Sequence, residues 1–468
     1  MRHFSQGRFT QQMNLLRQQF VQSSELPFGD LLSSAAITQV LAAAKLVVAD
    51  RIYTPLTTLL VFLWQVTSQD HSCRQAVAKL IAHRVGRGEP ACSPETGGYC
   101  TARKRLPESV FADLARHTGR ELDARSPSDW RWKKRVVKVF DGSTVSMPDT
   151  PANQGEYPQP ASQQPGIGFP LARIAVVFSL ACGAVLDLAL CQWTGKGHSE
   201  LGLLRLLLSV FQPGDVMLAD RYLCSWFELA LLRRGEVDFV ARLHHRRRAD
   251  FRRGRRLGPD DHVVHWPKPP RPEWMDEATY DALPAELEVR EVRTCVPLPG
   301  FRTRAVIVAT SLVDHETYSA ADLAELYRQR WHAELDLRCL KATLQMDQLR
   351  CKTPELVRKE IWTHLLAYNL IRTVMAQAAH RHQLPPRTIS FKGALQTLTA
   401  FQPLLESTRP TDLACLHAQL LQAIATHRVA DRPNRCEPRA RKRRPKPYPL
   451  LTQPRAQARR ALLRNDLR

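Results

Sequence analysis

The sequence predicts an α/β protein in which a mixed β-sheet flanked by helices follows a helical region and is interrupted by a β-rich insertion. Three observations support this fold class. Residues 1–130 have mainly helical periodicity. From Val136 onward, short apolar runs come first in hairpin order and then alternate with helical segments, which is typical of a mixed sheet. Between 244 and 300 this alternation stops, and a buried strand returns at 305–309.

The chain is strongly basic. Its 468 residues include 67 lysines and arginines against 45 acids, which gives a net charge of +22 and an isoelectric point near 9.9. The length is sufficient for two to four domains and at least one large core. The excess of cations points to a polyanionic partner, with nucleic acid as the first candidate, although ribosomal or membrane-surface binding would share the sign of charge.

The cysteines and the apolar runs bear on the compartment. The eleven cysteines form no Cys-x-x-Cys pair, and an odd number of thiols within apolar stretches is typical of a reducing compartment. The first residues lack the apolar core of a signal peptide. The longest apolar run, Leu59–Trp64, is far shorter than the ~20 residues that a membrane span needs. We therefore expect a cytoplasmic protein with no membrane partner.

The helical region contains a short basic segment after a glycine turn. Helices are expected at 56–66 and 73–83, and Pro107 opens another that ends near residue 117. Between them, Tyr99–Arg105 is similar to the recognition helix of a helix-turn-helix unit, and the alternative is an ordinary basic helix end. Its candidate DNA contacts are Arg103, Lys104 and Arg105.

The predicted sheet begins with a short strand and continues through a hairpin. Val136–Phe140 is a β run followed by Asp141-Gly142, a turn signal, so we expect Asp141 to end the first strand. The fourth strand, 215–219, stops in the same way at Asp220. The remaining elements expected in this region are strands at 172–180, 185–191 and 238–242 and helices at 200–211 and 226–233.

The segment 244–300 is an insertion within the sheet domain. Seven arginines lie between 246 and 256, several prolines follow, and the run 287–296 has β character. Its tryptophans, Trp266 and Trp274, have two interpretations. They stack on an unpaired base, as aromatic residues do in nucleic-acid sites, or they form a small apolar cluster, which is the commoner arrangement.

After the insertion, one helix carries an unusual polar stripe. Ser319-Ala-Ala-Asp322 has the form of a capping box and starts this helix. The stripe consists of residues at offsets of 0, 3, 7 and 14: Tyr327, Arg330, Glu334 and Lys341. These offsets place the four side chains within about 60° of one another on a helical wheel. A carboxylate that binds metal beside cations that hold phosphate requires such a mixture.

The C-terminal part is predicted to be helical and then irregular. A long helix is expected from Pro354 to about residue 382, and periodicity is lost after Asp431. The basic run 439–446 is expected to be a disordered, solvated tail, for which solubility and contact with DNA are equally good explanations.

Three acids suggest a metal site. Taken singly, Asp141 is a turn residue, Asp220 a strand end and Glu334 an i,i+4 partner of arginine. If the first and fourth strands are neighbours, however, the two aspartates meet and a helix on that edge adds the glutamate. Converging carboxylates need a compensating cation. Two Mg²⁺ ions about 3.5–4 Å apart would supply it and would activate a water or a 3′-hydroxyl for attack on phosphorus.

A family resemblance is carried by Asp141-Gly-Ser143, by Leu218-Ala-Asp220-Arg-Tyr222 and by Tyr327-x-x-Arg330-x-x-x-Glu334 with Lys341 seven residues later. These motifs resemble the bacterial insertion-sequence transposases of the Asp-Asp-Glu class with the Tyr-Arg-Glu-Lys signature, the insertion-sequence-4-type family. The three acids and the other three signature positions all match. Tyr222 stands where many relatives have glycine or another residue. The specific motifs cover about 130–385.

The resemblance implies an organisation and a fold. It predicts a ribonuclease-H-like catalytic domain at 131–385, interrupted by the insertion at 244–300. A helical domain at 1–130 would bind DNA ends. Residues 386–468 would form a C-terminal helical region and basic tail.

The resemblance also implies roles for the site residues. Asp141, Asp220 and Glu334 would hold two Mg²⁺ ions, for which Mn²⁺ can substitute. The DNA backbone beside the cleaved phosphate would be held by Tyr327, Arg330 and Lys341. The partners implied are double-stranded DNA, as terminal inverted repeats and as target, and a second copy of the chain in a homodimer.

The implied reaction is cleavage at the ends of an insertion sequence, followed by transfer of the 3′-hydroxyl into target DNA, by excision and reinsertion through a hairpin. The alternatives are a nuclease of the same fold that only hydrolyses, and a DNA-binding regulator that has lost catalysis. A bacterial protein of this kind would be associated with the nucleoid through its DNA.

Overall fold

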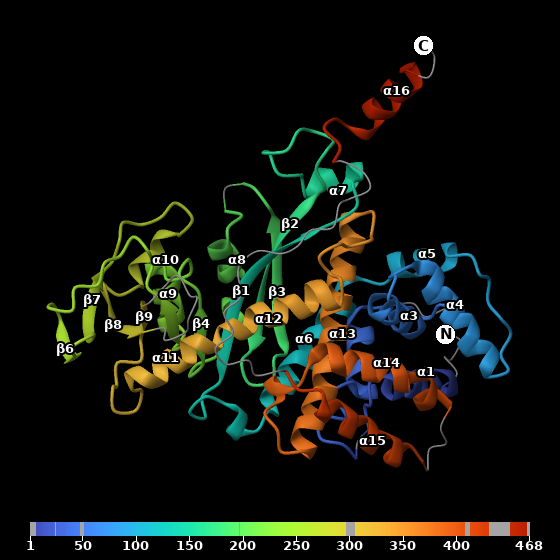
Figure 1. The fold of residues 1–468 in the computed structure, drawn as a ribbon, viewed down its shortest axis with the longest axis horizontal. Helices are drawn as coiled ribbons and strands as arrows, with labels where there is room; N and C mark the ends of the chain where they lie inside the picture. The colour runs from blue at the N-terminus through green and yellow to red at the C-terminus, as the bar shows by residue number, and fades with distance from the viewer. Residues whose placement is uncertain are drawn as a thin grey trace.

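The structure is a computed structural model that describes residues 6–23, 25–46, 51–195, 197–295, 305–407, 412–429 and 450–465. Within these residues, nine strands form a single sheet, in the order β3-β2-β1-β4-β5-β9-β8-β7-β6 (Figure 1). Helices from both ends of the chain gather at the β3 end of this sheet, and the insertion strands form its other end. None of the helices in the described part is both long and apolar enough to cross a membrane.

The half of the sheet that carries the predicted site is mixed, as expected. Its strands are β1 (Val137–Ser146), β2 (Leu171–Ser179), β3 (Val185–Gln192), β4 (Val216–Ala219) and β5 (Asp238–Arg242). Strands β1, β2 and β3 are antiparallel neighbours, whereas β4 runs parallel to β1 and to β5. The α/β fold class is therefore confirmed, with the order 3-2-1-4-5 of a ribonuclease-H-like core. The predicted adjacency of the first and fourth strands is confirmed as well.

Alternation along β1 divides the interior into two cores, because successive side chains of a strand point to opposite faces. Val137 and Val139 join the core that also contains the long helix α13 (Pro354–Arg381). Phe140 joins the second core, on the face covered by α8 (Glu200–Leu206) and α9 (Trp226–Arg234).

The insertion extends the same sheet. Its strands are β6 (Arg255–Gly258), β7 (Asp261–Pro267) and β8 (Glu286–Cys295), and antiparallel pairing with β9 (Ala305–Thr310) connects them to β5. The predicted β character is confirmed. Arg290 on β8 is fully buried, holds both oxygens of Asp261 at 2.8 and 2.5 Å, and donates to the Tyr318 carbonyl at 2.6 Å. The insertion thereby supports the start of the following helix.

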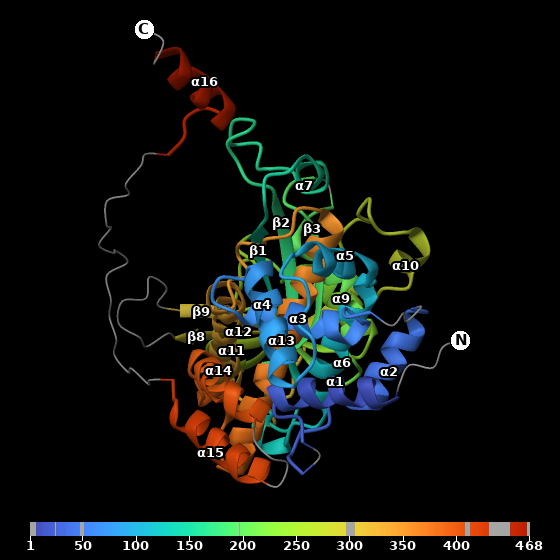
Figure 2. The same ribbon diagram turned by 90° about the vertical axis from the view of Figure 1, so that its right-hand side faces the viewer.

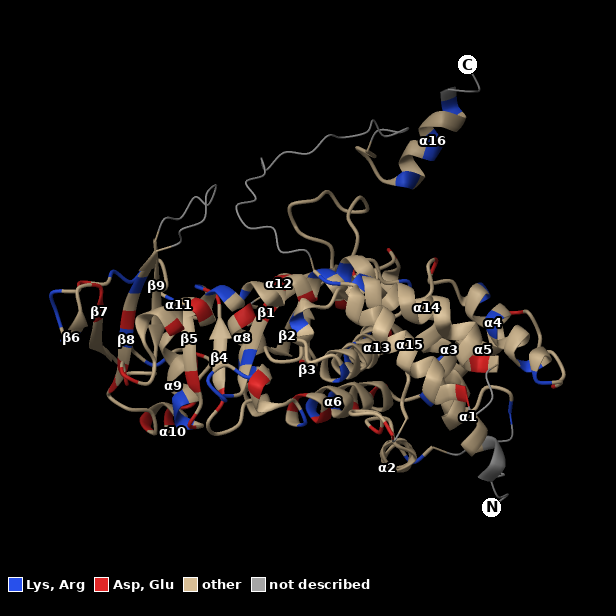
Figure 3. Ribbon diagram, turned by 60° about the horizontal axis from the view of Figure 1, so that its bottom comes forward, with Lys and Arg blue, Asp and Glu red and all other residues tan. Residues whose placement is uncertain are grey.

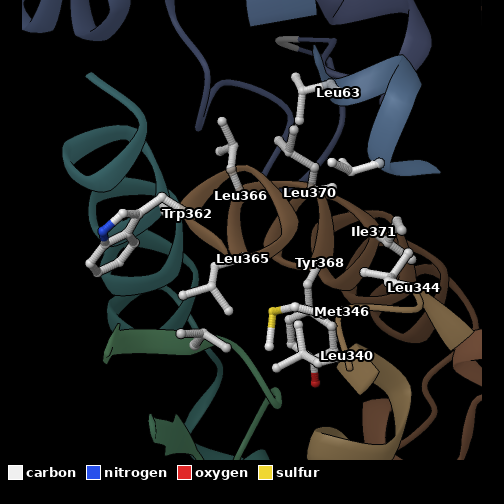
Figure 4. Close-up of a cluster of buried hydrophobic side chains, with 14 of the residues drawn as sticks. Leu63, Leu340, Leu344, Met346, Trp362, Leu365, Leu366, Tyr368, Leu370 and Ile371 are labelled. Atoms are coloured by element: carbon white, nitrogen blue, oxygen red, sulfur yellow. The ribbon is translucent and has the colours of Figure 1, made fainter. Parts of the chain in front are cut away.

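The helix α13 lies at the centre of the larger core. Around it pack α3 (Pro55–Thr67), α6 (Glu108–Ala124), α14 (Phe391–Ser407) and α15 (Leu413–Thr426). Figure 4 shows its Leu365, Leu366, Leu370 and Ile371 among side chains from other elements, including Leu63 of α3. The helices on either side of the sheet domain thus share one core with it. The division of the chain into domains at 130 and 385 stays a prediction.

The remaining elements of the helical regions and loops complete the fold. They are α1 (Gln6–Gln19), α2 (Ser34–Ala43), α4 (Cys73–Gly86), α5 (Gly97–Arg105), η1 (Ser128–Trp130), α7 (Pro151–Glu156), η2 (Leu208–Val210), α10 (Glu277–Asp281) and η4 (Pro386–Thr388).

The helix that carries the signature is broken, which corrects the prediction of one continuous helix. It consists of α11 (Ala320–Gln329), α12 (Trp331–Arg338) and the π-helical turn η3 (Cys339–Thr343). At the break, the Arg330 N–H donates to the Tyr327 carbonyl and the Ala333 N–H to the Arg330 carbonyl, at 3.2 and 3.0 Å. These three-residue bonds tighten the turn. The wheel angles of an ideal helix therefore do not apply across the four signature residues.

Two further expectations differ from the structure. Asp141 does not end its strand, because β1 continues to Ser146, where its backbone pairs with the chain around Gln348. The predicted tail at 439–446 lies outside the described residues. After it comes a helix that the sequence did not suggest, α16 (Arg455–Asn465), which stands apart from the rest of the fold (Figure 2).

A buried carboxylate fixes α12 to the scaffold. Asp336 is 1% exposed and accepts two hydrogen bonds from Arg387, at 2.6 and 2.8 Å, and one from Arg372 of α13. Arg387 also donates to the carbonyls of Ser179 and Leu180 at the end of β2. This network connects the Glu334 helix to both the sheet and the central helix.

We expect Asp336→Asn to lower the free energy of unfolding by about 3–5 kcal/mol, because it leaves the buried guanidinium of Arg372 and the partly buried one of Arg387 without their anion. Urea denaturation measures this change. The control is Glu325→Gln on α11, which removes an exposed pair with Arg328 and should cost less than about 1 kcal/mol. Equal urea midpoints for Asp336→Asn and the parent would show that this network does not hold α12.

Candidate active site

The register of two parallel strands brings Asp141 and Asp220 together. In the β1–β4 ladder, Val137 pairs with Val216 and Val139 with Leu218, a constant offset of 79 residues. The two aspartates have the same offset (220 − 141 = 79), so Asp141 lies level with the residue that directly follows β4. Residues level with each other on parallel strands point to the same face. That face is the one where Val137 and Val139 pack, beneath α12.

The third acid faces the same space. Glu334 of α12 lines an open cleft of about 570 Å³ together with Asp141 and Asp220. The other lining residues are Gly142, Arg330, Leu337, Arg338, Lys341, Ala342 and Asp347. The structure thus brings the three predicted acids and two of the predicted phosphate-binding cations into one cleft.

Arg330 stands between two of the acids. Its guanidinium donates to Glu334 Oε1 at 2.8 Å, and it lies 3.8 Å from Asp141 Oδ2. The i,i+4 pairing of Glu334 with arginine, one of the simple explanations of this residue, therefore occurs. Because the side chain of Arg330 is only 16% exposed, its charge compensates the acids at short range.

The surroundings of Asp141 change the pKa of its carboxyl group. Burial raises its pKa to about 6, and the negative charges of Asp220 and Glu334 add to this effect. The Arg330 charge and a hydrogen bond from the Gly142 N–H, at 2.9 Å, oppose it. Asp220 is held differently, since its Oδ1 accepts from the backbone N–H groups of Tyr222 and Leu223 in a turn. A carboxyl group with a pKa near neutrality in a cleft is typical of a functional site.

The continuation of β1 beyond Asp141 positions Lys341. The Ser143 side chain accepts a hydrogen bond from Lys341 Nζ at 3.0 Å. Further along, Ser146 exchanges backbone hydrogen bonds with Asp347 and Leu349. The strand therefore holds the chain on the C-terminal side of the signature, and the ammonium group stays at the cleft.

Tyr327 lies behind Arg330. It is partly buried, and burial raises the pKa of its phenol, while the neighbouring Arg330 and Arg242 charges oppose the shift. Arg242, at the end of β5, was not identified from the sequence. Burial lowers its pKa, the Arg221 and Arg330 charges add to this effect, and the Asp220 charge opposes it, so these charged groups lie near Arg242. Its position at a strand end, like that of Asp220, was the available signal.

The donor set fits a hard divalent cation, because the three acids offer carboxylate oxygens in a cleft that is open to water. Among the described residues, no group of three His, Cys, Asp or Glu side chains is arranged closely enough to hold a metal ion. Since Glu334 is paired with Arg330, that pair must separate before the glutamate can become a ligand. The binding of metal by these three residues stays a prediction.

One of the three candidate DNA contacts on the basic helix α5 is buried, which corrects the prediction for that residue. Arg103 is 5% exposed, its guanidinium lies over the rings of Phe62 and Tyr99, and it donates to Gln65 Oε1 at 3.2 Å. It is therefore not available to DNA in this structure, because its position on the helix points it into the core. Lys104 and Arg105 are exposed.

The two tryptophans of the insertion differ in their exposure to solvent. Trp266 is 4% exposed, belongs to the second core, and donates to Glu291 Oε1 at 3.0 Å. The apolar-cluster interpretation holds for this residue. Trp274 is 45% exposed, with the guanidinium of Arg205 at 3.8 Å from its ring centre.

The sequence matches a known protein family. The family described as Transposase DDE domain matches residues 132–370, more than half of the sequence and the whole region that builds the cleft. The chain belongs to this family of DDE transposases, which are enzymes.

Among individual proteins, it is similar to the transposase InsG for insertion sequence element IS4 of Escherichia coli K12. The identity is 26% over 434 residues, covering 90% of this chain and 92% of that protein. It is 41% identical over 83 residues to the putative transposase InsL for IS186A of the same organism, covering 18% and 21%. A solved structure, the piggyBac transposase synaptic complex with hairpin DNA, aligns with a TM-score of 0.42 and 11% identity, over 85% and 84% of the two chains.

The raised pKa of Asp141 has a consequence for stability without metal. The folded protein binds this proton more tightly than the unfolded chain does. Stability therefore falls as the pH rises from 3.8, the ordinary pKa of an aspartate, to about 6, and the loss is complete above that. Asp141→Asn should therefore be more stable than the parent at pH 8, with a smaller gain at pH 4. Thermal unfolding in chelator measures this difference.

The control for that measurement is Asp113→Asn, at an exposed carboxylate on α6, for which no pH-dependent gain is expected. If Asp141→Asn showed a larger gain at pH 4 than at pH 8, the description of a buried, charge-crowded Asp141 would be incorrect.

Proposed function

We propose that the protein cleaves DNA at the ends of an insertion sequence in a divalent-metal-dependent reaction and transfers the resulting 3′-hydroxyl into target DNA, by excision and reinsertion. The observation that carries this proposal is the β1–β4 register, which sets Asp141 level with Asp220 beneath the helix that carries Glu334. Three carboxylates with basic residues around them are the groups that phosphoryl transfer with metal ions requires.

Each residue of the cleft has a defined part in this proposal. The three carboxylates would hold two Mg²⁺ ions, or Mn²⁺ in their place, and the metal would polarise the phosphate and activate the attacking oxygen. Without metal, Arg330 pairs with Glu334. When a metal ion binds beside Glu334, the guanidinium of Arg330 would leave the glutamate and bind the phosphate instead. Lys341 and Tyr327 would contact the neighbouring backbone. In this exchange, a cation lies beside Glu334 both before and after the metal binds.

The charge of the chain and the names of its relatives indicate which molecules it binds. The net charge of +22 suits a polyanion, and the relatives are named as transposases of insertion sequences. Figure 3 shows basic and acidic residues close together along α11 and α12 and a basic segment beside β6. We propose terminal inverted repeats and target DNA as the substrates, with Lys104 and Arg105 as contacts outside the cleft. A homodimer would hold two ends together, within the cytoplasm of a bacterium.

One experiment distinguishes transposition from simple hydrolysis. The full chain is incubated with Mg²⁺, a supercoiled plasmid and pre-cleaved linear DNA with the element's ends. We expect products in which the linear DNA is covalently joined to the plasmid, detected on gels with a labelled end. Plasmid nicking without joined products would indicate a hydrolysis-only nuclease, and no reaction of any kind would indicate a regulator.

The matched variants are Asp220→Asn and Glu325→Gln. Loss of the carboxylate at 220 should reduce joining by at least about 10³-fold while end binding, measured by gel shift, is retained. Glu325→Gln changes an exposed carboxylate on α11 and should leave joining unchanged. Undiminished joining by Asp220→Asn would refute the assignment.

A separate prediction concerns Lys341. If its ammonium contacts a phosphate, Lys341→Gln should weaken end binding for all sequences alike and reduce the slope of log K against log salt by about 0.9. Fluorescence anisotropy at several salt concentrations measures this slope. The control is Lys392→Gln, at an exposed position on α14. An unchanged slope for Lys341→Gln would mean that Lys341 acts only as a partner of Ser143.

A further inference from the structure

Three cysteine sulfurs surround one buried guanidinium outside the catalytic cleft. Arg103 of α5 lies 3.4 Å from Cys73 Sγ and 3.5 Å from Cys100 Sγ through one nitrogen, and 3.7 Å from Cys351 Sγ through another. Cys73 is the first residue of α4, Cys100 lies on α5, and Cys351 precedes α13. The residues come from three distant parts of the sequence, so the sequence alone did not suggest this group.

Among the side-chain atoms that accept a hydrogen bond from the guanidinium, the sulfurs are the ones that can carry a negative charge. The rings of Phe62 and Tyr99 lie 4.9 and 4.7 Å from it, and its Nε has no hydrogen-bond partner. Gln65 contributes a neutral amide oxygen. Buried Glu360, which is hydrogen-bonded to Cys351, adds an acidic group near Arg103. A thiolate in direct contact with the guanidinium lowers the cost of burying this cation further. In the described part of the chain, these sulfurs do not form a metal-binding group.

Cys73 and Cys100 are the pair that can react. Both are only partly buried, whereas Cys351 is buried. Their thiols are hydrogen-bonded to each other, and this bond, with the charges of Arg103 and Lys104, lowers the pKa of Cys100 to about 5, although burial opposes the shift. The same hydrogen bond and burial raise the pKa of Cys73. One sulfur is thus held as an anion, and the other keeps its proton.

We propose that Cys100 and Cys73 form a peroxide-reactive thiol pair that closes to a disulfide between α4 and α5. The Cys100 thiolate attacks hydrogen peroxide, an S–O bond forms as the O–O bond breaks, and hydroxide leaves, so Cys100 becomes a sulfenic acid. The Cys73 thiol then loses its proton and attacks that sulfur, and water leaves. The sum is one thiolate, one thiol and one peroxide giving one disulfide, one water and one hydroxide, and the hydroxide takes a proton from solvent to become the second water.

The pair has no part in the chemistry of the carboxylate cleft. Arg103 connects α5 with Cys351, which follows the signature segment, so the pair lies where the N-terminal helices meet the catalytic part of the fold. A disulfide removes the anionic sulfur from the guanidinium. The oxidised protein therefore loses one of the contacts that hold this junction.

The first test uses the unmodified full chain. Alkylation with iodoacetamide is followed for each cysteine by mass spectrometry between pH 6 and 8. The rate at Cys100 should change less than about twofold, because a thiol with a depressed pKa is already ionised. Exposed Cys415 serves as the internal control, and its rate should rise nearly tenfold per pH unit. A rise at Cys100 as steep as that at Cys415 would overturn the proposal.

The second test follows the disulfide. Treatment with a small excess of hydrogen peroxide should give a peptide that links Cys73 to Cys100, and dithiothreitol should remove it. In Cys73→Ser, the product at Cys100 should be a sulfenic acid trapped by dimedone. Cys415→Ser is the matched control and should form the disulfide as the parent does. Over-oxidation of exposed cysteines without a 73–100 link would contradict the proposal.

Discussion

The parallel pairing of β1 with β4 is the constraint on which the rest of the site depends. A ladder with a constant offset of 79 residues brings Asp141 level with Asp220 and directs both to the face that α12 covers. A shift of the register by one residue would turn one aspartate toward the opposite core. Both strands are buried on their two faces, with Val137 and Phe140 in different cores, so the register is strongly specified.

Charge balance is the second constraint on the cleft. Three acids in a space of about 570 Å³ repel one another, and Arg330 compensates two of them in the absence of metal. Burial raises the pKa of Asp141, and the other two acids add to the shift, although the Arg330 charge opposes it. A cleft in this state has room for further positive charge. The same arginine that balances the acids is suited to a phosphate, because its planar group binds either partner in the same way.

The scaffold holds the signature helices by buried ions rather than by apolar packing alone. Arg290 of the insertion binds the chain just before α11, and Asp336 ties α12 to Arg372 and Arg387. Arg290, Asp336 and Arg372 are nearly inaccessible to solvent, so the removal of one partner leaves a charge buried without compensation. The insertion therefore has a structural effect on the cleft, although none of its residues up to 295, the part that the structure describes, lines it.

The sequence by itself determined most elements, the mixed sheet, the three acids and the four signature residues, because periodicity, caps and strand ends are local properties. It could not determine the break at Arg330, the continuation of β1 past Asp141 or the burial of Arg103. Each of these residues contacts a segment that is distant in the chain: Arg330 lies beside Asp141, Ser146 pairs with the chain near 348, and Arg103 contacts Cys351. Only the tertiary structure decided them, because a local pattern specifies which residues share a face and not what that face meets.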